Sequence, residues 1–165
     1  MPLTPEGEKQ ARFLGQRLRR VGVEPLRVLS SPRQRAIETA RLAGFEIPEV
    51  THLLVEFDYG DYEGRTSAEI RTENPDWDLF TDGCPGGETP DQVAQRASRL
   101  LADLAPEDGG GDVLLFAHGH ILRILATTYL GQPPSDARHL FLDTAAVCVL
   151  GHEHSWRAIR LWNVA

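Results

Sequence analysis

The run VLLFA at residues 113–117 constrains the fold more than any other feature of this sequence. It is continuously apolar, as is typical of a strand covered on both faces, and such strands belong to parallel sheets flanked by helices. A second short apolar run at residues 26–30 precedes a polar turn and a helical pattern, and residues 50–57 look like another strand. Together these segments predict an α/β fold with an open, mostly parallel sheet.

Helical periodicity accounts for much of the rest. Thr4 and Pro5 read as the cap and first residue of a helix that runs to about Gly22, and Thr89 and Pro90 open a long helix that the PEDGGG segment closes. We also expect a helix after Pro32, a short helix at 67–73, an irregular loop from there to 88, a helix at 121–130, and closing strands at 145–150 and 156–162.

Size and charge limit the classes of function. We expect 165 residues to form one globular domain spanning residues 1–165. A net charge of -7 argues against a nucleic-acid or anionic-membrane surface, so a small anionic substrate would need local arginines. Lys9 is the only lysine, which excludes a P-loop nucleotide site. No signal or membrane segment is expected, and Cys84 and Cys148 form no metal-type pair, which favours a reducing compartment such as the cytoplasm.

The segment SSPRQRA is a candidate phosphate site. Ser30 and Ser31 stand at a strand end, and Arg33 and Arg35 follow in the first turn of a helix, where free N–H groups and the helix dipole favour an anion. The competing interpretation is that both arginines are solvated surface groups and that Ser31 is only a helix cap.

Glu56 and His118 are candidates for the chemistry itself. Glu56 lies between an apolar segment and a Gly-Tyr turn, where it either faces a partly buried crevice as a general acid or pairs with an arginine at the rim. His118 follows the buried strand at the end where α/β sheets collect functional groups, although a structural histidine would fit there too.

Other arrangements of the same residue types remain open. His118 with His120, together with His152 and His154, could form a metal site, but no carboxylate or cysteine spacing supports one. Cys84 is interpreted as a packed loop thiol rather than a nucleophile. The loop from Glu63 to Glu88 is expected to cover the pocket, with Trp77, Phe80 and Cys84 in its wall.

Taken together, PLTPEGEKQA, SSPRQRAIETA, VEFDYGDYEG, CPGGET and FAHGH resemble the histidine phosphatase (phosphoglycerate-mutase-like) superfamily in order and spacing. The chain is similar to its branch of bacterial acid phosphatases and fungal sedoheptulose-bisphosphatases more than to glycolytic mutases. The resemblance implies a metal-independent phosphomonoesterase with no cofactor, acting on a small phosphorylated metabolite. It makes Arg35 a phosphate-binding residue, Glu56 the acid/base carboxylate and His118 a pocket histidine, with Arg33 and His120 as further phosphate-binding candidates.

In that family a central strand ends in Arg-His-Gly, whose histidine attacks phosphorus. Here Pro2 follows Met1 directly, so we expect this chain to lack the nucleophile and to be nearly inactive. A late start assignment, a shortened chain and a real loss are the three explanations, and the retained site residues favour the first. Strands 26–30 and 113–117 are expected to flank the missing strand, and exposed edges would favour a homo-oligomer.

Four functions follow as alternatives. The first is phosphatase activity through a phosphohistidine. The second is a non-catalytic module that binds phosphorylated ligands in the same pocket. A metallohydrolase that uses the H-x-H pairs and a phosphoglycerate-mutase-type phosphotransferase are the third and fourth.

Overall fold

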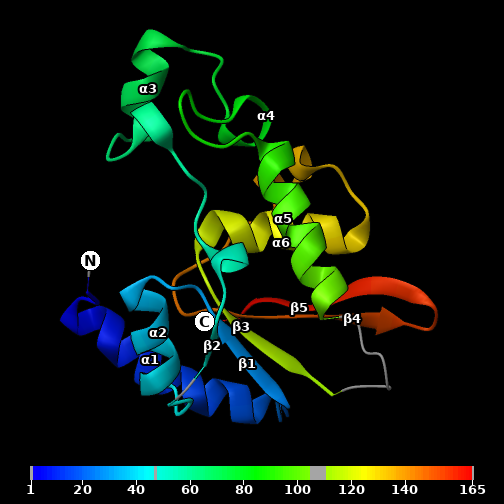
Figure 1. The fold of residues 1–165 in the computed structure, drawn as a ribbon. Coiled ribbons are helices and arrows are strands. Elements are labelled where there is room, and N and C mark those ends of the chain that lie inside the picture. Colours follow the sequence, from blue (N-terminus) through cyan, green and yellow to red (C-terminus); the bar gives the residue numbers. More distant parts are fainter. Residues whose placement is uncertain (1, 47, 105–110, 165) are drawn as a thin grey trace.

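The structure is a computed structural model that describes residues 2–46, 48–104 and 111–164 (Figure 1). Its parallel sheet consists of β1 (Arg27–Ser30), β2 (Glu49–Val50) and β3 (Val113–Phe116), in the order β2-β1-β3. A separate antiparallel pair is formed by β4 (Val147–Glu153) and β5 (Trp156–Val164). The predicted α/β architecture with a parallel sheet is therefore confirmed.

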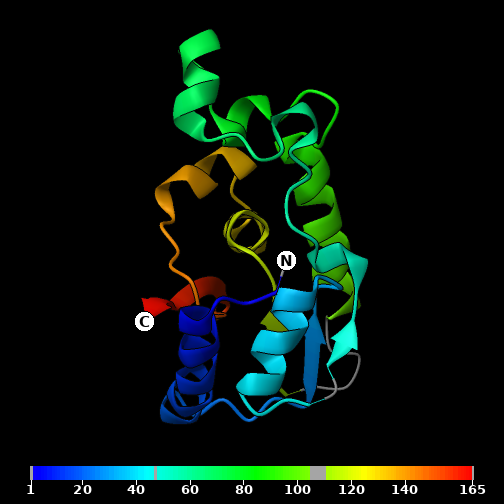
Figure 2. The ribbon, with the colours of Figure 1, turned by 90° about the vertical axis from the view of Figure 1, so that its left-hand side faces the viewer.

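Helices cover both faces of the parallel sheet (Figures 1 and 2). The first pair, α1 (Pro5–Arg20) and α2 (Gln34–Leu42), packs on one face. The second pair, α5 (Pro90–Asp103) and α6 (Gly119–Leu130), packs on the other. None of the helices in the described ranges is both long and apolar enough to cross a membrane.

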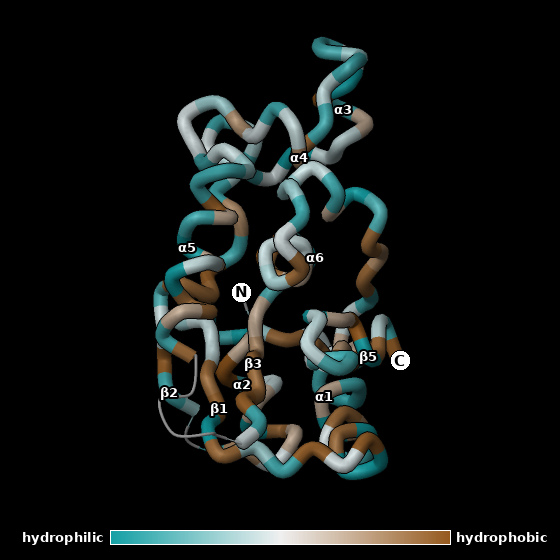
Figure 3. The backbone as a smooth tube through the Cα atoms, turned by 90° about the vertical axis from the view of Figure 1, so that its right-hand side faces the viewer, coloured by the Kyte–Doolittle hydropathy of each residue, from teal (hydrophilic) through white to brown (hydrophobic). Residues whose placement is uncertain are grey.

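Side chains of β3 alternate between two cores, as the pleat of a strand requires. Leu114 and Phe116 pack with Leu14 and Leu18 of α1, whereas Leu115 packs in the larger core. The buried members of that larger core include Leu29, Val93, Ala97, Leu100, Ile121 and Ile124. Burial on both faces explains why the strand is continuously apolar, and the hydropathy colouring of Figure 3 shows this apolar centre along β1 and β3.

The remaining segments lie beyond the carboxyl ends of the strands. They comprise α3 (Ser67–Glu73), α4 (Leu79–Asp82) and the 3-10 helices η1 (His52–Leu54), η2 (Gly60–Tyr62) and η3 (Pro134–His139). In Figure 1, α3 and α4 form the top of the molecule, above α5 and α6. The predicted short helix at 67–73 is confirmed, and α4 is a helical turn within the segment predicted to be irregular.

The predicted strand at 50–57 is largely wrong. Only Glu49 and Val50 pair with β1, and the chain then turns into η1. The Thr51 hydroxyl accepts a hydrogen bond from the Leu53 N–H, which gives the backbone a local partner in place of a sheet ladder. The apolar residues that suggested a strand are buried for another reason, since Leu54 is fully buried against the larger core.

One predicted helix end differs from the structure, and the segment predicted to close another helix lies mostly outside the described residues. The first helix ends at Arg20, two residues before Gly22, which adopts a positive φ of 71°. The helix opened by Thr89 runs to Asp103 and begins with a capping box formed by Thr89 and Gln92, and most of the PEDGGG segment lies outside the described residues.

The relation of β1 to β3 also differs from the expectation. They were expected to flank a further strand, but they pair directly, with Arg27 opposite Val113 and Ser30 opposite Phe116. Direct pairing satisfies the backbone groups of two buried strands that end at the same level. In the described sheet, the side of β3 opposite β1 is therefore a free edge.

A groove of about 860 Å³ separates the parallel sheet from the β4–β5 pair. β3 forms one wall and β4 the opposite wall, and apolar side chains of α1, α5 and α6 close its faces. Pro2, Leu3 and His118 lie along this groove as well. Among the described strands, β3 pairs with β1 only and β4 with β5 only, so both walls present backbone edges to the groove.

Gly15 allows α1 to approach the end of α2. A Cβ atom at Gly15 would lie 2.4 Å from the carbonyl oxygen of Ala43, whereas a Cβ at Gly7 in the same helix would make contacts of 3.4 Å or more. Alanine normally stabilises a helix interior by about 1 kcal/mol relative to glycine. We predict that Gly15→Ala instead lowers the free energy of unfolding by about 1–3 kcal/mol, because the backbones must separate. Urea unfolding checks this, with Gly7→Ala as the control, and equal stabilisation of both variants would contradict the close approach.

Candidate active site

The predicted site residues meet at the carboxyl ends of β1 and β3. Ser30 ends β1, and the chain continues through Ser31 into α2, which carries Arg35. β3 ends at Phe116, and His118 caps the start of α6. Because the strands are parallel and adjacent, both connections open at the same edge of the sheet, where ligands of open α/β sheets bind.

His118 is held by two side chains from the β1–α2 connection. Arg35 Nε donates to His118 Nδ1 at 3.2 Å, and His118 Nε2 lies 2.8 Å from Ser31 Oγ. An arginine can only donate, so Nδ1 is the acceptor and the ring proton resides on Nε2, facing Ser31. Burial, together with the positive charges of Arg35 and Arg33, lowers the pKa of His118 to about 4, so the ring is neutral near pH 7.

The Glu56 carboxylate is bound to the start of α6. Oε1 accepts from the backbone N–H of Phe57 at 2.9 Å and of Ile121 at 3.0 Å, and Oε2 accepts from His120 N–H at 3.2 Å. The first N–H groups of a helix have no partner within the helix, so Glu56 supplies one. Its side chain is 14% exposed and forms no ion pair with an arginine, so the rim alternative is not what the described residues form.

His120 faces away from the groove into a second cavity. Its Nδ1 lies 2.6 Å from the Tyr59 hydroxyl and 3.9 Å from Glu56 Oε2. Burial raises the pKa of Tyr59, so the phenol keeps its proton and donates to the imidazole. Burial also lowers the pKa of His120. A neutral histidine and a carboxylate thus stand side by side between the groove and the second cavity.

We call this second space the outer cavity. It has a volume of about 560 Å³, a size typical of small-molecule sites, and lies between the start of α6 and residues 59–84. Trp77, Phe80 and Cys84 line it, so they do form a cavity wall as predicted, but this cavity is not the groove lined by His118, Glu56 and Arg35. Burial raises the pKa of the Cys84 thiol to about 11, so this cysteine is protonated and packed rather than nucleophilic.

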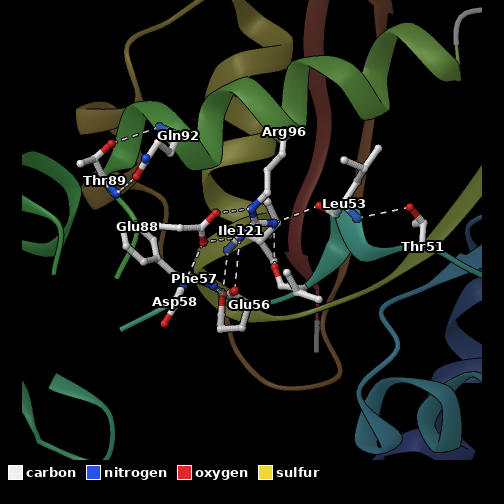
Figure 4. A network of polar contacts seen from close by, with 11 residues as sticks. Thr51, Leu53, Glu56, Phe57, Asp58, Glu88, Thr89, Gln92, Arg96 and Ile121 are labelled. Carbon is white, nitrogen blue, oxygen red and sulfur yellow. Dashed lines mark hydrogen bonds and ion pairs between the residues drawn. The ribbon is translucent and has the colours of Figure 1, made fainter. Parts of the chain in front are cut away.

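Arg96 of α5 is the residue that the sequence did not single out. Its guanidinium donates to three carbonyl oxygens, those of Leu53, Val55 and Glu56, at 3.0, 2.8 and 3.2 Å. It also donates to both carboxylate oxygens of Glu88, at 2.8 and 3.0 Å (Figure 4). All five N–H donors of the guanidinium are used. Arg96 therefore positions the backbone on which Glu56 stands.

The weaker candidates are placed differently. Arg33 and Arg35 are both exposed, but the Arg35 side chain donates to His118, whereas Arg33 contacts the site through its backbone N–H, which donates to Ser31 Oγ at 3.3 Å. His152 and His154 lie in the β4–β5 hairpin, in a different part of the fold from His118 and His120. The two H-x-H pairs therefore do not form one site, and the described residues contain no group of three or more potential metal ligands.

Comparison with known proteins gives a consistent result. Residues 1–165 match the histidine phosphatase superfamily (branch 1). An acid phosphatase of Mycobacterium tuberculosis is 40% identical over 95% of this chain and 77% of that protein. Sedoheptulose 1,7-bisphosphatase of Saccharomyces cerevisiae is 33% identical over 79% of this chain and 59% of that protein. A solved structure of an M. tuberculosis open reading frame product superimposes with a TM-score of 0.94 at 38% identity, covering 99% of this chain and 84% of that one.

Replacement of the Arg96 guanidinium tests whether it positions the backbone segment that carries Glu56. In Arg96→Met, Glu88 and three carbonyl groups lose their partner in a site where Arg96 is 11% exposed. We predict a loss of about 3–5 kcal/mol in the free energy of unfolding, measured with urea. Arg99→Met changes an exposed arginine of the same helix and is the matched control. Equal losses in both variants would show that the network does not position this segment.

The pKa of His118 predicts a pH dependence of stability. Its folded value of about 4 lies below the unfolded value of about 6.5, so on acidification the unfolded chain takes up the proton first. Stability is therefore lost as the pH falls from about 6.5 towards 4. Between pH 7.5 and 5.0 we expect the protein to lose about 2 kcal/mol more than His118→Gln does. Urea titrations at both pH values measure this, and His152→Gln, an exposed histidine, should behave like the unsubstituted protein.

Proposed function

Because the chain belongs to the histidine phosphatase superfamily (branch 1), we propose that it hydrolyses small phosphate monoesters, such as sugar phosphates, through a phosphohistidine intermediate. The observation that carries the proposal is the meeting of Arg35, His118 and Glu56 at one edge of the sheet. A cation and a neutral imidazole donor can bind the phosphoryl oxygens, and a positioned carboxylate can serve as the acid/base group, while the nucleophile must be a further group.

Each of these residues has a role in the proposed reaction. Arg35 and His118 bind the phosphoryl oxygens. When phosphate binds, Arg35 donates to a phosphoryl oxygen instead of to His118, because the negative charge makes that oxygen the stronger acceptor. As the nucleophile forms the P–N bond and the P–O bond breaks, Glu56 in its protonated form transfers its proton to the leaving oxygen. Water then attacks phosphorus, and the P–N bond breaks as the new P–O bond forms, so that the histidine leaves. Glu56 takes up the proton of that water, and inorganic phosphate is released.

The nucleophile is proposed to lie on a strand in the groove. The family resemblance implies an Arg-His-Gly histidine, and the printed sequence contains no Arg-His-Gly. Pro2 and Leu3 line the groove together with His118. The edge of β3 that faces this groove is free among the described strands, and a strand bound there parallel to β3 would place its carboxyl end beside His118.

The second candidate is a binding module without turnover. His118 is the only histidine of the described chain that lines the groove, and its ring is neutral and engaged with Ser31. These residues alone support saturable binding of a phosphorylated metabolite in the same pocket. We place either function in the cytoplasm, which is consistent with the two free cysteines.

The first experiment measures phosphate release from an aryl phosphate and a sugar bisphosphate. It compares this chain with one extended upstream to the preceding in-frame start. We expect turnover by the extended chain and a rate lower by about 10⁴ or more for residues 1–165, because a covalent nucleophile is lost. Binding without turnover by both chains would instead support the binding module.

Variants and products separate the remaining alternatives. In the chain that turns over, Glu56→Gln should lower kcat by about 10²–10⁴, because proton transfer to the leaving oxygen is lost. Glu24→Gln, at an exposed carboxylate outside the site, should leave kcat unchanged.

Isomerised product without free phosphate would indicate a mutase, and activity abolished by a chelator would indicate a metallohydrolase. A second copy paired with the β3 edge would appear as a dimer in size-exclusion chromatography.

A further inference from the structure

Ser31 carries a buried hydroxyl group to which the proposed reaction gives no role. The residue is fully buried and directly follows β1. Its backbone N–H donates to the carbonyl oxygen of Phe116 at 2.9 Å, which continues the pairing of β1 with β3. Its Oγ lies 2.8 Å from Nε2 of His118 and accepts from the backbone N–H of Arg33 at 3.3 Å. The sheet and the following turn therefore hold this hydroxyl beside the imidazole.

The two ring nitrogens of His118 face different surroundings. Nε2 faces Ser31, which does not line the groove, whereas Nδ1 faces Arg35, which does. A ligand in the groove therefore reaches His118 through Nδ1. Because the neutral ring carries its proton on Nε2 in this arrangement, Nδ1 offers only a lone pair. That lone pair accepts from Arg35, but it cannot bind a phosphoryl oxygen, which is itself an acceptor.

The Ser31 hydroxyl can resolve this mismatch, since a hydroxyl either donates or accepts. At present its oxygen accepts from Arg33 N–H and from Nε2–H of His118. Within residues 2–46, 48–104 and 111–164, no further hydrogen bond uses the proton of this hydroxyl. With the ring proton on Nδ1, the hydroxyl can turn and donate to Nε2. Its proton then gains an acceptor, and Nδ1–H becomes a donor for a phosphoryl oxygen.

The charges around His118 favour a change of protonated nitrogen over a second ring proton. Burial and the positive charges of Arg35, Arg33 and Arg96 lower the pKa of His118, whereas the Glu56 carboxylate acts in the opposite direction. The ring therefore stays neutral before and after the change. Nδ1 takes up one proton from water and Nε2 releases one to water, so the charge of the ring is the same in both arrangements.

We propose that Ser31 is a positioning residue that selects which nitrogen of His118 is protonated. While Arg35 donates to Nδ1, the hydroxyl accepts from Nε2–H. When Arg35 moves to a phosphoryl oxygen, the hydroxyl donates to Nε2, and His118 donates from Nδ1 to the phosphoryl group. This rests on the proposed function, in which Arg35 and His118 bind the phosphoryl oxygens. The hydrogen bond made by one ring nitrogen of a histidine sets the protonation of the other.

NMR spectroscopy of the protein with ¹⁵N-labelled histidine tests the proposal, because protonated and unprotonated ring nitrogens differ widely in chemical shift. Inorganic phosphate is the ligand, at about pH 7.5, where the histidine is neutral. The spectrum of His118→Gln identifies the signals of His118. We expect the proton on Nε2 without phosphate and on Nδ1 at saturation. A proton that stays on Nε2, a ring that carries both protons, or no saturable change at all would overturn the proposal.

Two adjacent buried serines provide a matched pair of variants. Ser31→Ala removes the partner of Nε2, so phosphate should bind about 10–100-fold more weakly and the ring proton should not change nitrogen. Ser30→Ala removes a hydroxyl that donates to the carbonyl oxygen of Ser31 at 3.0 Å rather than to His118, and the change should persist. Ser31→Thr retains a hydroxyl and should restore the change in part, which separates the role of the hydroxyl from a folding defect in the alanine variant. A change of protonated nitrogen that survives Ser31→Ala would overturn the role of Ser31.

Phosphate release by the extended chain distinguishes this proposal from the proposed function. If the ring proton moves to Nδ1 but no chain hydrolyses phosphate esters, the phosphatase activity is contradicted while the role of Ser31 is supported. Hydrolysis by a chain whose ring proton stays on Nε2 in the presence of phosphate would support the phosphatase activity and contradict the role of Ser31.

Discussion

The Arg96 guanidinium is the interaction on which the rest of the site depends. It lies between α5 and the segment that precedes Glu56, and it also binds Glu88. Glu88 in turn accepts from the backbone N–H of Asp58 at 3.0 Å, so the two loops that meet there share one cation. A guanidinium with five directed donors can satisfy several irregular backbone segments at once, which a lysine cannot. The irregular segment after β2 therefore has a defined conformation without belonging to a sheet.

The consequence of that anchoring is a carboxylate held between two spaces. Glu56 and His118 line the groove, while His120 lines the outer cavity. Backbone N–H groups of α6 hold Glu56, and the same helix start carries both histidines. In the proposed hydrolysis, Glu56 is placed to exchange a proton with a ligand bound in the groove. These side chains are fixed by the start of α6 and by the Arg96 contacts rather than by one loop, so the distances between Glu56 and the two histidines are well defined.

The positive charge near the candidate site comes from a few arginines and not from the net charge of the protein. The chain has a net charge of -7, yet Arg33 and Arg35 lie near His118, and Arg123 lines the outer cavity. A negative net charge does not attract small anions, so anion binding at this edge of the sheet would depend on nearby arginine side chains. The neutral state of His118 follows from the same crowding, because burial and two neighbouring arginines disfavour a further positive charge.

Local sequence determined the elements and much of the site, while tertiary structure decided how they are joined. The apolar run before His118, the Ser-Pro-Arg turn and the helix caps are encoded within a few residues, because burial on both faces, proline and capping act over short distances. The strand expected at 50–57 failed because periodicity does not reveal the turn at Thr51. The direct pairing of β1 with β3, the groove beside β4 and the role of Arg96 were decided only by the fold. β1 and β3, and Arg96 and the three carbonyl groups that it binds, lie about 40 or more residues apart in sequence, and only packing brings such distant groups within hydrogen-bonding distance.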